Sequence, residues 1–415
     1  MQVFESEGAV GGRMRTHRYD GYIIDQGAET LGAYGYSRTW ELVRAVGIRP
    51  EEVLRVRPPV GLWRGSRVHP YVGHPILGGL AGAGLSLRGR LALTRLAVPL
   101  VRRARSYDPD APGGSPLGEL TVADFAAHQP EEIRDYLLQP AVGTAWNWDP
   151  RRSCVAPLVS TMLATRGIFR WRTYRDGMDT LARKLAERLP VHVGRQVCEV
   201  RSRGGAIALR FLDGETMTAR NAVLAVPAPV ALALHPSMPD DEREYLAACT
   251  YAPMIRITCP LDAPIQPARE AGRFRVYALL VPAREDGVLS GITFEHNKAG
   301  NRAPAGRGLV SILAGRAVAG ELISQPDDDV TRTMLPLAEK YLPGLGASCR
   351  AAFVHRFPHG APEATPAALR GSAEFLRRQP RAVDYAGDWV YQRPSSEAAV
   401  RSALLAASRL LSKAG

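Results

Sequence analysis

The chain has 415 residues, 46% of them hydrophobic, which suffices for two sizeable cores and excludes a disordered or fibrous protein. The formal net charge is +12. Arginines supply most of the basic excess, but they are scattered and not interleaved with aromatic residues, so we expect no nucleic-acid partner.

The five cysteines lie far apart and form no Cys-x-x-Cys pair. This spacing speaks against a disulfide framework and against a thiolate metal site, and it fits a reducing cytoplasm. No apolar stretch reaches the roughly 18 to 20 uncharged residues that span a bilayer. We therefore expect a cytoplasmic protein that is soluble or peripheral to a membrane, with no indication of its oligomeric state.

The first predicted element is a short strand over Met1–Glu5 that ends in an acidic residue. In dinucleotide-binding folds a carboxylate at this position accepts hydrogen bonds from ribose hydroxyls, which makes Glu5 a candidate binding residue. An exposed strand-end glutamate without a ligand is the alternative. The turn that follows contains Gly11 and Gly12, where the backbone can approach an anionic ligand, and Arg13 comes directly after it.

A hairpin through Asp20-Gly21 is predicted next, and it leads to Gly27 and Ala28. An acidic strand end, Gly-Gly-Arg, a threonine and Asp-x-Gly-Ala thus follow one another. This pattern resembles the superfamily of flavin-dependent amine oxidases and protoporphyrinogen oxidases. The resemblance implies that Gly11, Gly12, Arg13, Gly27 and Ala28 bind FAD.

The same resemblance implies an α/β fold class. The expected architecture is an FAD/NAD(P)-binding Rossmann-like domain, incomplete at its N-terminus, with an inserted mixed α+β substrate domain. We expect the FAD-binding-like domain to be discontinuous, over residues 1–58, 175–240 and 380–415. The substrate-binding domain is expected over residues 59–174 and 241–379.

Residues 37–46 have apolar positions at helical spacing, and residues 58–74 have the pattern of two short strands. Residues 76–105 form a basic amphipathic stretch that is rich in Leu, Ala and Gly. It has two interpretations: a helix on a membrane surface, or a helical segment of the substrate domain whose basic face is solvated. We favour the second. Further helices are predicted over residues 121–127 and 130–138, with a loop at 108–116 between them and the basic stretch.

From Tyr174 the pattern predicts a turn, a helix over residues 179–188 and strands over 191–193 and 197–200. The resemblance implies that the backbone of Val197 meets the adenine. Strands over 206–211 and 216–218 continue the segment, and residues 221–229 read as a fully buried parallel strand. The β-rich stretches 251–261, 274–281, 291–294 and 309–313 suggest an antiparallel sheet that floors a substrate cavity. The segment from Asn297 to Gly306 is more similar to bacterial protoporphyrinogen oxidases than to amine oxidases.

At the C-terminal end, Gly387 and Asp388 follow an apolar strand, and a helix capped by Ser395 or Ser396 runs to about Leu411. A capped terminal helix packed on a sheet is the structural alternative. The resemblance implies that Asp388 binds the ribityl chain and that the helix N-terminus faces the flavin, where a positive dipole end stabilises negative charge. The residues assigned to this contact by resemblance are Gly387, Asp388, Ala398, Ala399 and Val400.

The family's Gly-x-Gly-x-x-Gly turn, which holds the pyrophosphate, is expected to precede Met1 and does not occur in this sequence. Two explanations stay open: a working oxidoreductase whose first βα unit is missing from the sequence, or a flavin-fold protein with a non-redox role. The first predicts noncovalent FAD and hydride abstraction from a C–N or C–C bond of a hydrophobic or polycyclic small molecule. The second predicts a cyclase, an isomerase or a binding protein for a hydrophobic metabolite.

Candidates for other chemistry are few. Arg256 stands on a strand similar to the one that carries a water-holding lysine in many amine oxidases, so it is a catalytic candidate, with a structural ion pair as the alternative. His355 and His359 are spaced by four, but Pro358 argues against a helix there and hence against a metal site. Ser153 and Ser160 lack the context of a nucleophile elbow.

Overall fold

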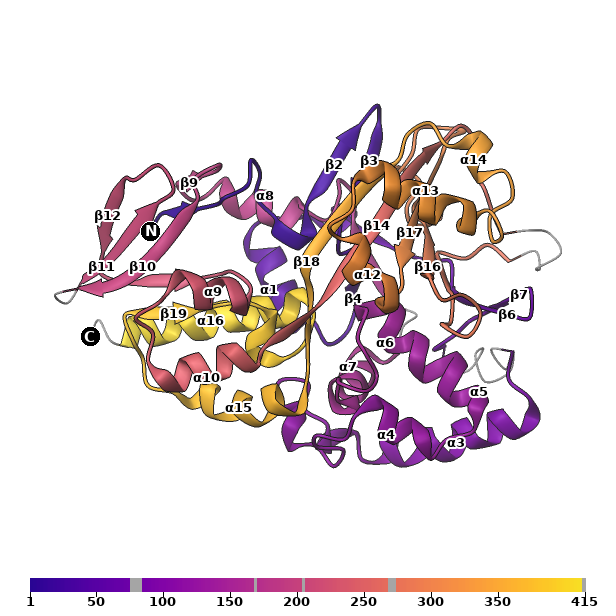
Figure 1. Cartoon of the computed structure of the whole chain (residues 1–415), viewed down its shortest axis with the longest axis horizontal. Helices are drawn as coiled ribbons and strands as arrows, with labels where there is room; N and C mark the ends of the chain where they lie inside the picture. Colours follow the sequence, from indigo (N-terminus) through magenta and orange to yellow (C-terminus); the bar gives the residue numbers. More distant parts are fainter. Residues whose placement is uncertain (75–83, 168–169, 204–205, 268–273, 413–415) are drawn as a thin grey trace.

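The computed structural model describes residues 1–74, 84–167, 170–203, 206–267 and 274–412. Figure 1 shows a large sheet with its helices at the upper right, a helical region below it, and a second group of strands and helices on the left. This mixed α/β arrangement confirms the predicted fold class.

The large sheet has seven strands in the order β18-β14-β17-β16-β15-β6-β7. Their bounds are β6 (Val60–Arg64), β7 (Arg67–Pro70), β14 (Thr250–Leu261), β15 (Ala278–Leu280), β16 (Leu289–Phe294), β17 (Gly308–Ala314) and β18 (Phe353–Glu363). The predicted antiparallel sheet is confirmed for β14, β17, β16 and β15, and the β6/β7 hairpin extends it at one edge, with β6 parallel to β15. The strand predicted over 274–281 is shorter than expected.

One face of this sheet is covered by helices whose apolar residues share its core. These helices are α12 (Arg316–Leu322), α13 (Asp327–Ala338) and α14 (Leu345–Ser348). Between β16 and β17 lies the short helix α11 (Glu295–Lys298), whose four residues are all buried. Burial of charged residues on such a short helix requires charged partners, and these are described below.

The helical region is formed by residues 84–165 and has its own core around Trp148. Its helices are α3 (Leu87–Arg102), α4 (Val122–Ala127), α5 (Glu131–Ile133), the π-helical turn η6 (Arg134–Leu138), α6 (Gln139–Trp146) and α7 (Val155–Thr165), with the 3₁₀ turns η4 (Ala104–Ser106) and η5 (Pro112–Gly114). The predicted helices at 121–127 and 130–138 are confirmed, and Thr121 caps α4 through its side chain. Residues 76–83 of the predicted basic stretch lie outside the described residues.

The group on the left of Figure 1 contains two pairs of parallel strands and a three-stranded antiparallel sheet. The parallel pairs are β1 (Val3–Phe4) with β9 (Val191–His192) and β13 (Ala222–Leu224) with β19 (Val383–Tyr385), and the antiparallel sheet comprises β10 (Val197–Arg203), β11 (Ala206–Phe211) and β12 (Thr216–Ala219). Around them lie α8 (Thr180–Ala186), α9 (Ala228–Leu234), α10 (Asp240–Ala248), α15 (Pro366–Arg377), the 3₁₀ turn η8 (Asp388–Tyr391) and α16 (Ser396–Ser412).

The prediction of a fully buried strand over 221–229 is wrong. β13 ends at Leu224, and Val223 is 41% exposed. Because β13 pairs with β19 alone among the described strands, only the face that carries Leu224 packs into a core, while the side chain of Val223 lies on the open face. The predicted parallel direction is nevertheless confirmed by the pairing of β13 with β19.

The front of the chain connects these regions. The predicted hairpin consists of β2 (Thr16–Tyr19) and β3 (Tyr22–Asp25), with Asp20 and Gly21 both at positive φ in the turn. The 3₁₀ turn η1 (Gly12–Met14) precedes it, and β4 (Leu31–Gly32), α1 (Ser37–Ala45), η2 (Pro50–Glu52), β5 (Val53–Arg55) and β8 (Trp171–Tyr174) complete this part. No helix in the described ranges is long and apolar enough to cross a membrane.

Candidate functional site

Arg13 and Asp388, which are 375 residues apart in the sequence, form a two-pronged ion pair. Arg13 donates from Nη2 to Oδ1 of Asp388 at 2.7 Å and from Nη1 to Oδ2 at 2.9 Å. Its Nη1 also donates to the carbonyl of Gly360 at 2.9 Å. Burial opposes the charged form of Arg13, but Asp388 more than offsets this and raises the arginine pKa. The front and C-terminal motifs therefore meet at one place.

Glu5 lies at the end of β1, and its carboxylate can accept further hydrogen bonds. Its Oε1 accepts a hydrogen bond from the amide of Glu7 at 3.0 Å, whereas its Oε2 has no partner within the described parts of the chain. The Glu5 carbonyl accepts from the amide of Arg195 at 2.8 Å. Val197, two residues further on, begins β10. The structure thus brings Glu5 and Val197 onto adjoining segments.

Gly27 and Ala28 pack against the backbone of Arg13. The amide of Ala28 donates to the Arg13 carbonyl at 2.9 Å, and a Cβ on Gly27 would lie only 2.2 Å from that oxygen. Gly27 is therefore required by this close approach. Gly12 differs, because its φ is +50° and an added Cβ would meet no atom within 4 Å, which leaves its backbone open to a ligand.

The C-terminal helix α16 begins at Ser396, and Ser395 caps it by accepting from the amide of Ala398 at 3.2 Å. Ala398 is buried, whereas Ala399 and Val400 are half-buried. Gly387 is tightly packed, since a Cβ there would lie 2.5 Å from Nε1 of Trp389.

Glu397 joins α16 to the N-terminus of α1, a contact that the sequence did not predict. Its Oε2 accepts from the amide and the hydroxyl of Thr39 at 2.9 and 3.0 Å, and its Oε1 accepts from the amide of Arg38 at 3.2 Å. Burial alone would favour the neutral acid, but these hydrogen bonds lower the pKa of Glu397. A carboxylate at a helix N-terminus is favourable, so Glu397 fixes the C-terminal motif against the front segment.

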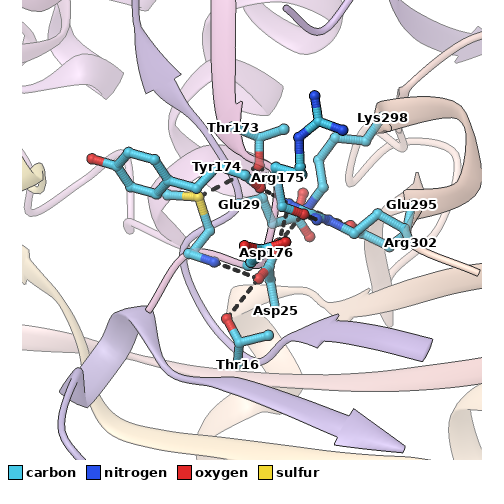
Figure 2. A network of polar contacts seen from close by, with 12 residues as sticks. Thr16, Asp25, Glu29, Thr173, Tyr174, Arg175, Asp176, Glu295, Lys298 and Arg302 are labelled. Atoms are coloured by element: carbon cyan, nitrogen blue, oxygen red, sulfur yellow. Dashed lines mark hydrogen bonds and ion pairs between the residues drawn. The ribbon is translucent and has the colours of Figure 1, made fainter. Parts of the chain in front are cut away.

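A buried cluster of six charged residues lies behind Gly27, and Figure 2 shows part of it. It contains three acids and three bases with side chains 0 to 11% exposed, namely Asp25, Glu29, Glu295, Arg256, Lys298 and Arg302. Nζ of Lys298 lies 2.8 Å from Oδ2 of Asp25 and also pairs with Glu295. When all three acids are ionised, the charges balance one another, which offsets the cost of burying them.

Arg256, the catalytic candidate, is a member of this cluster. It donates to the carbonyl of Gly27 at 2.9 Å and pairs with Glu29, and it lies 3.6 Å from Glu295. The hydroxyl of Thr293 bridges both glutamates, at 3.0 Å from Glu29 and 2.9 Å from Glu295. In this arrangement the guanidinium of Arg256 is engaged by acids and by the backbone of the Asp-x-Gly-Ala segment, which is the geometry of a positioning residue.

The two glutamates titrate in opposite directions. Burial favours the neutral form of Glu29, but Arg256 and Lys298 lower its pKa to about 2. Burial and the negative charge of Glu29 raise the pKa of Glu295 to about 7. At neutral pH this pair of glutamates therefore comprises one firmly ionised carboxylate, Glu29, and one carboxyl that can exchange a proton, Glu295.

A cavity of about 370 Å³ lies beside the Arg13–Asp388 pair. The rings of Tyr251 and His359 meet there with centroids 5.3 Å apart, and the next residue along the chain, Gly360, binds Arg13. Burial lowers the pKa of His359, and the positive charge of Arg13 lowers it further, so the imidazole is neutral at pH 7. The lining residues are Pro229, Leu232, Leu246, Ala247, Cys249, Thr250, Tyr251, Pro358 and His359.

Sequence reasoning missed Tyr251, Glu29 and Lys298 as parts of this region. The signal for Lys298 was its place in the Asn297–Gly306 segment, which was used only to judge the subfamily. His355 and His359 lie on the strand β18 and not on a helix, as Pro358 indicated. Burial lowers the pKa of His355 to about 3, so it is a neutral core histidine.

A scan against known protein families matches residues 1–411 to the flavin-containing amine oxidoreductases. The chain belongs to this family. It is a flavin-dependent oxidoreductase, as the front and C-terminal motifs predicted. A search of curated protein sequences finds no match.

Several solved structures share the fold. Putrescine oxidase bound to putrescine has 15% identity and a TM-score of 0.77, with coverage of 100% of this chain and 93% of that one. Cyclohexylamine oxidase from Brevibacterium oxydans IH-35A has 16% identity and a TM-score of 0.75, and a provisionally named protoporphyrinogen oxidase from Exiguobacterium sp. 255-15 has 16% and 0.72, both covering 99% of this chain and 93% of their own.

The residues present suit the family's flavin cofactor. The free Oε2 of Glu5 could accept from ribose hydroxyls, and the open backbone at Gly12 and the guanidinium of Arg13 would be the donors for phosphate oxygens. The N-terminus of α16 favours negative charge. When bound, the flavin supplies the hydride acceptor of the family's reaction. The chain itself positions these donors through the Arg13–Asp388 pair and through Glu397.

Proposed function

We propose that this oxidoreductase binds FAD noncovalently and oxidises a C–N or C–C bond of an uncharged or singly charged hydrophobic substrate, including polycyclic ones. The observation that carries this proposal is the lining of the 370 Å³ cavity, which contains no aspartate, glutamate, lysine or arginine. Without an acidic side chain, a doubly charged diamine would lose its hydration and gain no ionic partner. An apolar or aromatic substrate loses little hydration in this cavity, and the burial of its apolar surface favours binding.

Cys249 supports noncovalent attachment of the cofactor. It is the one cysteine among the residues that line the cavity, and burial raises its pKa to about 12. Because the thiolate is the nucleophile in covalent attachment, a thiol with so high a pKa is unreactive at neutral pH. We therefore expect acid precipitation of the purified protein to release all of its flavin into solution.

Turnover of two amine series tests the substrate proposal. We expect hydride transfer from cyclic and polycyclic monoamines or hydroaromatic compounds, and a much slower reaction with linear diamines. The transfer is measured as bleaching of the flavin absorbance under anaerobic conditions. Leu232→Glu introduces an acid into the cavity and should depress the reaction of neutral substrates at least tenfold with the flavin spectrum preserved. Leu212→Glu, at an exposed leucine on the β11–β12 turn, is the matched control. Preferred oxidation of diamines by the unmodified protein would refute the proposal.

A further inference from the structure

The helix α3 exposes apolar side chains on the face that points away from the protein. Leu87 is 81% exposed, Leu91 51%, Val98 39% and Val101 62%. At about 100° per residue these four positions form one stripe along the helix. Figure 1 shows α3 at the lower edge of the molecule, where its outer side faces solvent.

The opposite face of α3 is apolar as well. Leu93, Leu96 and Leu100 are half-buried on the inner side, and Leu100 packs against the core of the helical region. A helix that only has to cover a core needs one apolar face, with polar residues on the other. A basic face that is simply solvated therefore does not account for the outer stripe.

Arginines flank the outer stripe, and no acid in the described parts of the chain pairs with them. Arg88, Arg95 and Arg102 lie along one side of it, and Arg103 and Arg105 follow at its C-terminal end. All five are exposed, and none of them forms an ion pair with an acid among the described residues. No acidic residue occurs between Leu85 and Tyr107. An apolar centre beside free guanidinium groups is the pattern of an interfacial helix.

We propose that α3 lies flat on an anionic phospholipid surface, with Leu87, Leu91, Val98 and Val101 inserted among the acyl chains and the arginines on the headgroup phosphates. Charge favours lipid over a second copy of the chain. Two copies that met through this face would bring their unpaired arginines together, and each chain already carries a formal net charge of +12. Phosphate groups supply the missing negative charge, and arginine binds them well.

Co-sedimentation of the purified holoprotein with lipid vesicles tests this inference. The vesicles are an equimolar mixture of phosphatidylcholine and phosphatidylglycerol, with pure phosphatidylcholine as the neutral reference. We expect binding to the anionic vesicles that weakens with added salt, and much weaker binding to the neutral ones. Arg88→Gln with Arg95→Gln should lower the partition coefficient about 25-fold, since each basic residue near an anionic surface contributes roughly fivefold. Arg57→Gln with Arg220→Gln, two exposed arginines elsewhere without ion pairs, should leave it unchanged.

The apolar stripe needs its own variants. Leu87→Gln with Leu91→Gln should reduce binding to the anionic vesicles at least tenfold, while Leu212→Gln, at another exposed leucine, should not. These side chains are exposed, so the variants should keep the unfolding temperature of the parent. Equal binding of the leucine variant and its control would overturn insertion of the helix. A concentration-dependent dimer that is lost in the leucine variant, measured by light scattering, would assign the face to a second copy and overturn the proposal as well.

Discussion

Replacement of Lys298 by methionine tests whether charge balance holds the buried cluster together. The ammonium group of Lys298 is fully buried and pairs with Asp25 at 2.8 Å and with Glu295. Methionine keeps most of the volume but removes the charge. The cluster would then contain three acids, Asp25, Glu29 and Glu295, against the two arginines.

The expected loss of stability follows from the free energy that it costs to bury an ion without a partner. Removal of one partner from a buried ion pair costs about 3 to 5 kcal/mol. Arg302 still lies 3.3 Å from Asp25, and Glu295 can take up a proton because its pKa is about 7. We therefore expect Lys298→Met to lower the free energy of unfolding by about 3 kcal/mol at pH 8, and by less at pH 6, where Glu295 is mostly neutral.

A second substitution separates charge balance from packing. Lys298→Met combined with Glu295→Gln leaves two acids and two bases, so we expect it to recover about half of the loss. Lys184→Met, at an exposed lysine paired with Glu187 on the surface, should cost less than about 0.5 kcal/mol. The free energy of unfolding is measured by urea titration, with near-ultraviolet circular dichroism as the signal. A loss below about 1 kcal/mol for Lys298→Met, or a double variant less stable than the single one, would refute the reasoning.

Three further predictions concern neighbouring contacts. Glu295→Gln should flatten the pH dependence of stability between about pH 4.5 and 7. The folded-state pKa of Glu295 is raised from its usual 4.5, so ionisation of this residue removes up to about 3 kcal/mol of stability as the pH rises through this window. An unchanged slope of stability against pH in urea titrations would contradict this prediction. Glu397→Gln should lower stability by about 2 kcal/mol in thermal unfolding, because the amide replaces a carboxylate at the N-terminus of α1; a change below about 0.5 kcal/mol would show that this contact is unimportant. Arg13→Gln leaves Asp388 without its partner and should reduce the flavin retained through gel filtration severalfold, whereas Arg220→Gln should retain as much as the parent protein.

The Asp20-Gly21 hairpin and the helix at 37–46 could be predicted because each depends on residues close together in the chain. The turn needs positive φ at both residues, and the helix needs only its apolar spacing. The strand over 221–229 was predicted with the correct partner direction but the wrong burial. An apolar run indicates a strand, whereas burial depends on which other elements cover both of its faces.

The family could be recognised from the sequence, because the Gly-Gly-Arg and Gly-Asp segments are short patterns that can be read without coordinates. The contacts that join these segments became visible in the three-dimensional structure. The Arg13–Asp388 pair, the hydrogen bonds of Glu397 to the N-terminus of α1, and the ion pair of Arg256 with Glu29 each connect residues more than two hundred positions apart. Such contacts leave no local periodicity in the chain, since the free energy of a buried ion depends on what surrounds it in space and not on its neighbours in sequence.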